Sequence, residues 1–208
     1  MRPQTFSLPP LYAIIDSALF PVDSALFDFA EQLVAAGVSL VQYRNKRGSA
    51  RQSLRQARGL RHRLSEKTRL IMNDRADLCL AADLDGVHLG QTDLSPSSVR
   101  SLLGEGKIIG YSTHNLVQIE EGAALPADYL AIGPIFSTSS KENPDPEVGL
   151  ENLRAARRLT RKPLVAIGGI TAANYRSVMD AGADSVAVIS ALAESPKKRV
   201  EEFLRVLG

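Results

Sequence analysis

Short apolar runs recur along the chain, and longer stretches of mixed polarity separate them. The runs are nearly continuous rather than alternating, which is typical of parallel strands that are buried on both faces. We expect strands at 11–16, 39–44, 69–73, 86–89, 108–112, 129–132, 164–168 and 185–189. The pattern therefore favours a parallel α/β fold.

Most of the intervening stretches are long enough for a crossover helix. Residues 22–36 place their apolar side chains on one stripe at helical spacing, and Gly37 follows where a helix C′ glycine belongs. In residues 171–181, Thr171 is the expected N-cap and Gly182 the C′ glycine. The helices near 75–82 and 115–122 are expected to be short.

A faint repeat supports this organisation. The segments "AAGVSLVQYR", "AADLDGVHLG", "LPADYLAIGP" and "DAGADSVAVI" each lead from a small residue through a turn into an apolar strand. Eight strand–helix units in about 200 residues predict a compact (β/α)8 TIM barrel, a single domain over residues 1–208. An open doubly wound sheet is the alternative, but the eight units and the absence of GxGxxG favour closure.

Composition narrows the classes of partner and the compartment. The net charge of +2 comes without a basic stripe interleaved with aromatics, so we expect no nucleic-acid partner. A single cysteine, Cys79, excludes an intrachain disulfide and fits a reducing compartment. No apolar run approaches the roughly 20 residues that span a bilayer, and "MRPQTFSLPP" lacks the apolar core of a signal peptide. We therefore expect a cytoplasmic protein without a membrane segment, and allow for a homo-oligomer.

Polar residues and glycines gather where the predicted strands end. In such barrels the loops that follow the strands form the active face. The segments at these ends are "VQYRNK", "MNDR", "HLGQTD", "GYSTH", "GPIFSTSSK", "AIGGI" and "AVISA". This clustering predicts an enzyme.

The second strand ends in cationic residues. Gln42 and Arg44 lie two positions apart and share a strand face, which we place toward the barrel mouth, with Tyr43 toward the helices. Lys46 follows on the loop. An arginine fork beside a lysine suits phosphate oxygens, although a plain surface cluster is the alternative.

Asp74 and Asp93 follow neighbouring strands. Two adjacent carboxylates repel each other unless a cation or a shared proton lies between them. Mg²⁺ is a natural cation here because it takes hard oxygen ligands and is often completed by water and substrate phosphate. The alternative makes Asp74 a helix N-cap and Asp93 a turn residue.

A second anion site is expected at the last two strands. The pair Gly168–Gly169 is expected to open a helix, whose backbone N–H groups would meet an anion, with Ser190 nearby. The alternative is that the glycines only make the turn. Two anion sites on one barrel mouth suggest two phosphorylated ligands.

The longest irregular stretch is 133–149. In it, the hydroxyls of Thr138 and Ser140 and the ammonium of Lys141 could close over anionic ligands. A solvated polar loop is the alternative. Among the histidines, His88 is expected to be a hydrogen-bonded structural residue. His114 is the histidine near the active face and a candidate for a direct role.

The ordered set "QYRNK", "NDRADL", "GVHLGQTDL", "GYSTH", "GPIFSTSSK", "AIGGI" and "AVISA" resembles the thiamine-phosphate synthase family, from about residue 11 to 192. Each motif is weak alone, but seven in order are highly specific. The resemblance implies that 4-amino-2-methyl-5-(diphosphooxymethyl)pyrimidine is joined to a thiazole phosphate, giving thiamine phosphate and diphosphate. Both substrates are small molecules, and the implied cofactor is Mg²⁺.

The resemblance also implies roles for individual residues. The pyrimidine diphosphate would be held by Gln42, Arg44, Lys46, Asn73, Ser112 and Lys141. Mg²⁺ would be bound by Asp74 and Asp93, and the thiazole phosphate by Thr138, Ser140, Gly169, Ile189 and Ser190. Residues implied to act in catalysis are Arg44, Lys46, Lys141 and Ser112.

The family mechanism is dissociative: diphosphate leaves first, and the thiazole nitrogen attacks the resulting pyrimidine-stabilised methylene cation. Cationic side chains near the leaving group fit this chemistry. Two alternatives remain open: a thiazole tautomerase paralogue, for which His114 would shuttle protons, and a non-catalytic barrel that binds thiamine precursors.

Overall fold

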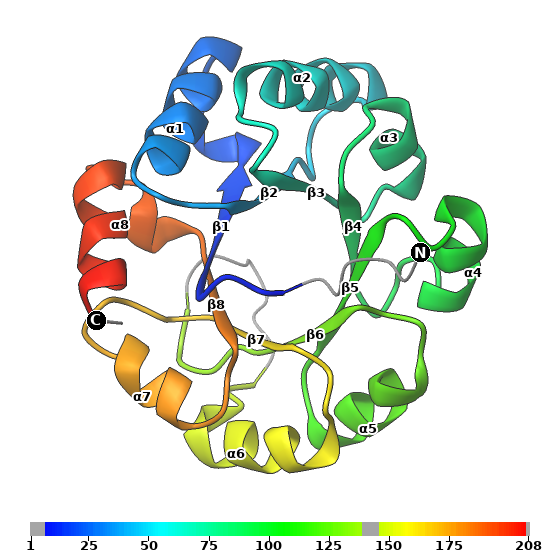
Figure 1. Ribbon diagram of the computed structural model, residues 1–208, viewed down its shortest axis with the longest axis vertical. Helices are drawn as coiled ribbons and strands as arrows, with labels where there is room; N and C mark the ends of the chain where they lie inside the picture. Colours follow the sequence, from blue (N-terminus) through cyan, green and yellow to red (C-terminus); the bar gives the residue numbers. More distant parts are fainter. Residues whose placement is uncertain (1–6, 139–145, 207–208) are drawn as a thin grey trace.

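The computed structural model describes residues 7–138 and 146–206. Within these ranges, eight parallel strands form one closed barrel in the order β1 to β8, and β8 pairs back with β1. Helices α1 to α8 form an outer ring around the strands, and α8 lies beside α1 where the ring closes (Figure 1). The predicted (β/α)8 barrel is confirmed, and the open doubly wound sheet is excluded.

The expected strand bounds agree with the structure to within one residue at each end. The strands are β1 Leu11–Asp16, β2 Leu40–Arg44, β3 Arg69–Asn73, β4 Gly86–Leu89, β5 Ile108–Thr113, β6 Tyr129–Ile132, β7 Leu164–Ile167 and β8 Ser185–Val188. The helices are α1 Asp23–Ala35, α2 Ala50–Arg63, α3 Ala76–Ala81, α4 Pro96–Leu103, α5 Leu116–Ala124, α6 Gly149–Leu159, α7 Tyr175–Asp180 and α8 Pro196–Arg205. Two short 3₁₀ helices, η1 Ser17–Leu19 and η2 Ser190–Leu192, follow β1 and β8.

The expectation for residues 171–181 is wrong at its start, because α7 begins only at Tyr175 and Asn174 is its N-cap. The Asn174 carboxamide instead holds the preceding turn. Its Oδ1 accepts the Thr171 N–H at 2.8 Å, and its Nδ2 donates to the Gly169 carbonyl at 3.0 Å. The expected C′ glycines are confirmed, since Gly37 and Gly182 have φ of +109° and +106°.

The core has two layers, as the alternation along each strand requires. The inner layer fills the barrel and consists of Tyr12, Ile14, Leu40, Ile71, Ile108, Tyr129, Ala131, Val165 and Ala187. The larger outer layer lies between strands and helices. Tyr43 belongs to the outer layer and its hydroxyl bonds Gln56 of α2, whereas Gln42 bonds Tyr12 of the inner layer. The predicted orientations of Gln42 and Tyr43 are therefore confirmed.

An arginine–aspartate clasp recurs at the N-terminal face of the barrel. In each copy, an aspartate directly before an even-numbered strand accepts the N–H of the preceding strand and an N–H of a helix guanidinium. The aspartates are Asp85, Asp128 and Asp184, their arginines are Arg61, Arg100 and Arg157, and the strand N–H groups belong to Leu70, Ile109 and Leu164. Each guanidinium also donates to backbone carbonyls of the adjoining turns. The clasps join helix, turn and two strands on the face opposite the expected active face.

Among the described helices, none combines the length and the apolar character needed to cross a bilayer.

Candidate active site

A pocket of about 790 Å³ opens at the C-terminal ends of the strands. The described residues predicted for the site all line it: Gln42, Arg44, Lys46, Asn73, Asp74, Asp93, Ser112, Thr138, Gly169, Ile189 and Ser190. Ser140 and Lys141 lie outside the described residues. The fold thus brings candidates from the ends of seven strands, β2 to β8, and the loops after them to one cavity, while their individual roles stay predictions.

Arg44, the last residue of β2, forms an ion pair with Asp16, the last residue of neighbouring β1. Asp16 is 8% exposed and its Oδ1 also accepts the Ala18 N–H at 3.0 Å. A carboxylate that is fixed in this way fixes the guanidinium beside it. Asp16 was not predicted as a site residue, because no polar cluster follows the apolar run of β1 in the sequence.

Asp74 follows β3 in the left-handed region, with φ of +62°. Its N–H donates to the His88 carbonyl at 2.8 Å, and its carboxylate pairs with Lys46. The N-cap alternative for Asp74 is wrong, because Arg75 occupies the N-cap position of α3. The backbone therefore turns the Asp74 carboxylate toward the pocket and away from the helix.

Asp93 lies on the loop after β4, where its Oδ2 accepts the Gly90 N–H at 2.7 Å. The turn role considered for Asp93 is thus confirmed, and the residue lines the pocket as well. Partial burial raises the pKa of the Asp93 carboxyl, the nearby Asp74 carboxylate raises it further, and the Gly90 N–H opposes both. The ammonium of Lys46, which pairs with Asp74, is the cation that the described residues place beside these two carboxylates.

The described residues contain no group of three or more acidic, histidine or cysteine side chains suited to a metal. The Asp74–Asp93 pair would therefore hold a divalent ion only with help from water or ligand oxygens. Mg²⁺ accepts this situation, since it keeps several waters and takes one or two carboxylates from the protein.

The glycine pair after β7 lies in a turn rather than at the start of a helix, whereas its expected role in binding an anion stays a prediction. No helix opens there, because α7 starts at Tyr175. Gly168 and Gly169 have φ of +100° and +65°, and added Cβ atoms would lie 2.5 Å from Pro134 Cβ and from the Ser137 carbonyl oxygen, respectively. Glycine is therefore required for the close approach of the loop after β6, and Gly169 lines the pocket through its backbone.

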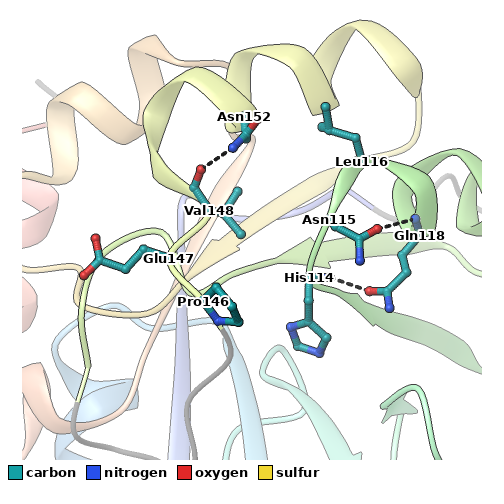
Figure 2. A pocket seen from close by; sticks show the side chains of 8 residues that line it. All are labelled: His114, Asn115, Leu116, Gln118, Pro146, Glu147, Val148 and Asn152. Carbon is teal, nitrogen blue, oxygen red and sulfur yellow. Dashed lines mark hydrogen bonds between the residues drawn. The ribbon is translucent and has the colours of Figure 1, made fainter.

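His114 stands at the border between this pocket and a smaller one of about 410 Å³, and Gln118 lines both as well. Figure 2 shows the smaller pocket, between the start of α5 and the segment that leads into α6. The His114 N–H donates to Gln118 Oε1 at 2.7 Å, and its ring Nδ1 lies 2.7 Å from the Gly133 carbonyl oxygen. The imidazole is thus held at the edge of the cavity rather than at its floor.

Three polar side chains lie at the floor of the pocket or directly behind it, and the sequence predicted a hydrogen-bonded role only for His88. Tyr12, His88 and Tyr129 are buried inside the barrel and hydrogen-bonded to one another or to predicted site residues. His88 is hydrogen-bonded, as expected, and its ring stacks on that of Tyr129 with centroids 5.5 Å apart. Tyr12 and Tyr129 lie in apolar runs, so the hydrophobic pattern predicted only that they pack in the core.

Fold and site together define a (β/α)8-barrel enzyme, with cationic and acidic side chains around one pocket at the C-terminal ends of the strands. The family model for thiamine monophosphate synthase matches residues 11–192. The chain belongs to this family. The membership confirms the family expected from the motifs and the class of enzyme, a transferase that forms thiamine phosphate.

Individual relatives agree with the family model. A thiamine-phosphate synthase of Koribacter versatilis (strain Ellin345) is 56% identical over 203 residues, covering 96% of both chains. Thiamine-phosphate synthase 1 of Aquifex aeolicus (strain VF5) is 39% identical over 208 residues and 95% of both chains. The solved structure of a thiamine phosphate pyrophosphorylase from Pyrococcus furiosus superposes with a TM-score of 0.84 at 32% identity, covering 95% of this chain and 94% of that one.

Proposed function

We propose that the chain joins 4-amino-2-methyl-5-(diphosphooxymethyl)pyrimidine to a thiazole phosphate and releases diphosphate. The observation that carries the proposal is the meeting of Arg44, Lys46, Asp74 and Asp93 at one pocket in a chain of this family. Both substrates carry phosphate groups, and this rim supplies cations and a metal-binding carboxylate pair for them.

Asp74 and Asp93 would hold Mg²⁺. Their neighbouring carboxylates, one with a raised pKa from burial and from its partner, are the kind of hard oxygen pair that the ion stabilises. When bound there, the ion would offset charge that grows on the departing diphosphate. Lys46 already lies against Asp74, so its ammonium is placed beside the same oxygens.

Other pocket residues would bind the diphosphate, the pyrimidine and the thiazole phosphate. Arg44, held by Asp16, would bind the diphosphate and stabilise the charge that develops as the carbon–oxygen bond breaks. Gln42 and Ser112 would bind the pyrimidine at the pocket floor. Gly169, Ile189 and Ser190 would bind the thiazole phosphate at the ends of β7 and β8.

The test is incubation of the full chain with both substrates and Mg²⁺, followed by detection of thiamine phosphate. We expect product with wild type and a loss of at least a hundredfold in Asp74→Asn/Asp93→Asn, because a metal site without carboxylates loses most of its affinity. Asp28→Asn, an exposed carboxylate on α1, is the matched control and should retain activity.

Three outcomes would contradict parts of the proposal. Full activity in the double variant would overturn the metal assignment. Binding of both substrates without turnover would favour the non-catalytic barrel, and interconversion of thiazole forms without condensation would favour the tautomerase that His114 leaves open.

We propose a cytoplasmic location as well, supported by the single buried Cys79. A homo-oligomer stays a prediction.

A further inference from the structure

A chain of hydrogen bonds crosses the floor of the pocket from β2 to β5. Gln42 Nε2 donates to the Tyr12 hydroxyl at 2.8 Å, and the hydroxyls of Tyr12 and Tyr129 lie 3.0 Å apart. The Tyr129 hydroxyl lies 2.9 Å from His88 Nδ1, and His88 Nε2 lies 2.8 Å from Ser112 Oγ. The two ends of this chain, Gln42 and Ser112, are the residues proposed to bind the pyrimidine.

The donor at one end sets one consistent direction for the bonds of the chain, in which each group accepts from one neighbour and donates to the next. An amide nitrogen only donates, so the Tyr12 oxygen accepts from Gln42 and its own proton goes to Tyr129. The Tyr129 proton then goes to His88 Nδ1, which leaves the imidazole proton on Nε2 to be donated to Ser112 Oγ. The Ser112 hydroxyl has one proton, which can then be donated to a ligand in the pocket that it lines.

The surroundings keep this chain intact. Tyr12 and Tyr129 are 1% and 0% exposed, and burial raises the pKa of both phenols, so both keep the protons that the chain needs. Gly110 makes room for the central bond: a Cβ there would lie 2.3 Å from the Tyr129 hydroxyl and 2.5 Å from His88 Nδ1. A glycine with ordinary backbone in the middle of β5 is explained by this close approach.

We infer that Tyr12, Tyr129 and His88 are positioning residues for the two ends of the chain. They make Ser112 a hydrogen-bond donor toward the ligand and leave the Gln42 carbonyl as an acceptor. The pocket therefore selects a 4-aminopyrimidine over its 4-oxo analogue. The inference rests on the proposed function and names the group by which its substrate is recognised. If the chain ran in the opposite direction, Ser112 would accept and Gln42 would donate, which suits the oxo form.

The two pyrimidines differ in the order of donor and acceptor along one edge. A 4-aminopyrimidine presents an amine donor beside a ring nitrogen that accepts. A 4-oxopyrimidine presents a carbonyl acceptor beside a ring N–H donor, so each contact that suits one form opposes the other. A buried site with fixed polarity rejects the mismatched form strongly, because its own polar groups lose their partners.

The test compares binding of two unreactive ligands to the full chain by calorimetry: 4-amino-2-methyl-5-(phosphooxymethyl)pyrimidine and its 4-oxo analogue. We expect wild type to prefer the amino ligand by about a hundredfold. Tyr129→Phe interrupts the chain at its centre and should lower this ratio at least tenfold. A residue that only supports the fold would weaken both ligands alike and leave the ratio unchanged.

Tyr175→Phe is the matched control. Tyr175 is also buried, packs in the outer layer against Phe203, and its hydroxyl has no hydrogen-bond partner within the described ranges. Removing that hydroxyl should leave the ratio at its wild-type value. A second measurement, ¹⁵N chemical shifts of His88 at pH 8, should show the proton on Nε2 in wild type and a changed tautomer balance in Tyr129→Phe.

The inference is overturned by a proton on Nδ1 of wild-type His88, by no preference between the ligands, by no binding of either, or by an unchanged ratio in Tyr129→Phe. These failures are separate from failure of the proposed reaction. A protein that shows the expected tautomer and preference but forms no thiamine phosphate refutes the reaction and leaves the recognition chain standing.

Discussion

Asp16 positions Arg44, although only Arg44 belongs to one of the sequence motifs. Arg44 lines the pocket, and Asp16, which pairs with it, is held in turn by the Ala18 N–H. Asp16→Asn keeps the shape but removes the charge, so the guanidinium loses its fixed orientation toward the diphosphate. We expect kcat/KM for the pyrimidine diphosphate to fall about tenfold, or about 1.4 kcal/mol, with KM for thiazole phosphate unchanged.

Steady-state kinetics with each substrate varied in turn measure this effect. Equal changes in both KM values would mean that Asp16 supports the whole pocket rather than Arg44. An increase in affinity for the pyrimidine diphosphate would mean that the Asp16 carboxylate competes with the substrate for the guanidinium.

Some site residues were predictable one at a time and others were not. Gln42 and Arg44 could be placed because strand period two fixes their common face. Tyr12 and Tyr129 could not, because a tyrosine inside an apolar run counts as apolar, and their hydroxyls meet across 117 residues of sequence. No local sequence pattern predicts a hydrogen bond between residues so far apart.

Asp23 links two neighbouring elements. It is the first residue of α1, and its carboxylate accepts Gln56 Nε2 at 2.7 Å and Arg55 Nε at 3.0 Å, both from α2. The hydrogen bond from Gln56 is the main cause that lowers the pKa of Asp23, and Arg55 lowers it further. A carboxylate with a lowered folded-state pKa stabilises the fold above its unfolded value near 3.9, and this stabilisation is lost as pH falls through the folded-state pKa.

We therefore expect Asp23→Asn to lose about 1 kcal/mol of unfolding free energy at pH 7 and little at pH 2. Urea unfolding at a series of pH values measures the difference, with Asp28→Asn on the same helix as control. A constant difference between wild type and Asp23→Asn from pH 7 to pH 2 would show that ionisation of Asp23 has no part in joining α1 to α2.

The three arginine–aspartate clasps should differ in strength according to burial. The side chain of Asp85 is 17% exposed, against 36% for Asp128 and 48% for Asp184. Hydrogen bonds to a charged group contribute more when water is excluded. We expect alanine at Asp85 to cost about 2–3 kcal/mol and at Asp184 about 1 kcal/mol, with Asp128 between them.

Denaturant midpoints of the three alanine variants test this order. Because the clasps lie on the face away from the pocket, kcat should stay near wild type in each variant while it is folded. A reversed order would show that the guanidinium's contacts with backbone carbonyls, rather than the buried carboxylate, dominate the clasps.

At the scale of the whole molecule, the barrel was predictable because its signal is repeated. Eight buried strands each carry the same apolar pattern, and each is followed by an amphipathic stretch, so an error in one unit does not change the fold. The turn after β7 was predicted less well. There a carboxamide three residues beyond Thr171 delays the start of α7, and a competing local hydrogen bond of this kind is hard to distinguish from a helix cap.

Cys79 offers a probe of the stability of the whole barrel. Its thiol is 0% exposed between α3 and the strands and lies 3.2 Å from the Gly86 carbonyl, and burial raises its pKa to about 11. Since the thiolate is the reactive form, a thiol reagent at pH 8 should label the native chain at least a thousandfold more slowly than the urea-unfolded chain. Labelling then reports opening of the fold. Mg²⁺ with the pyrimidine diphosphate should slow it further, because ligands that bind only the folded chain reduce the open population. Rapid labelling of the native chain, unaffected by these ligands, would mean that α3 opens independently of the barrel.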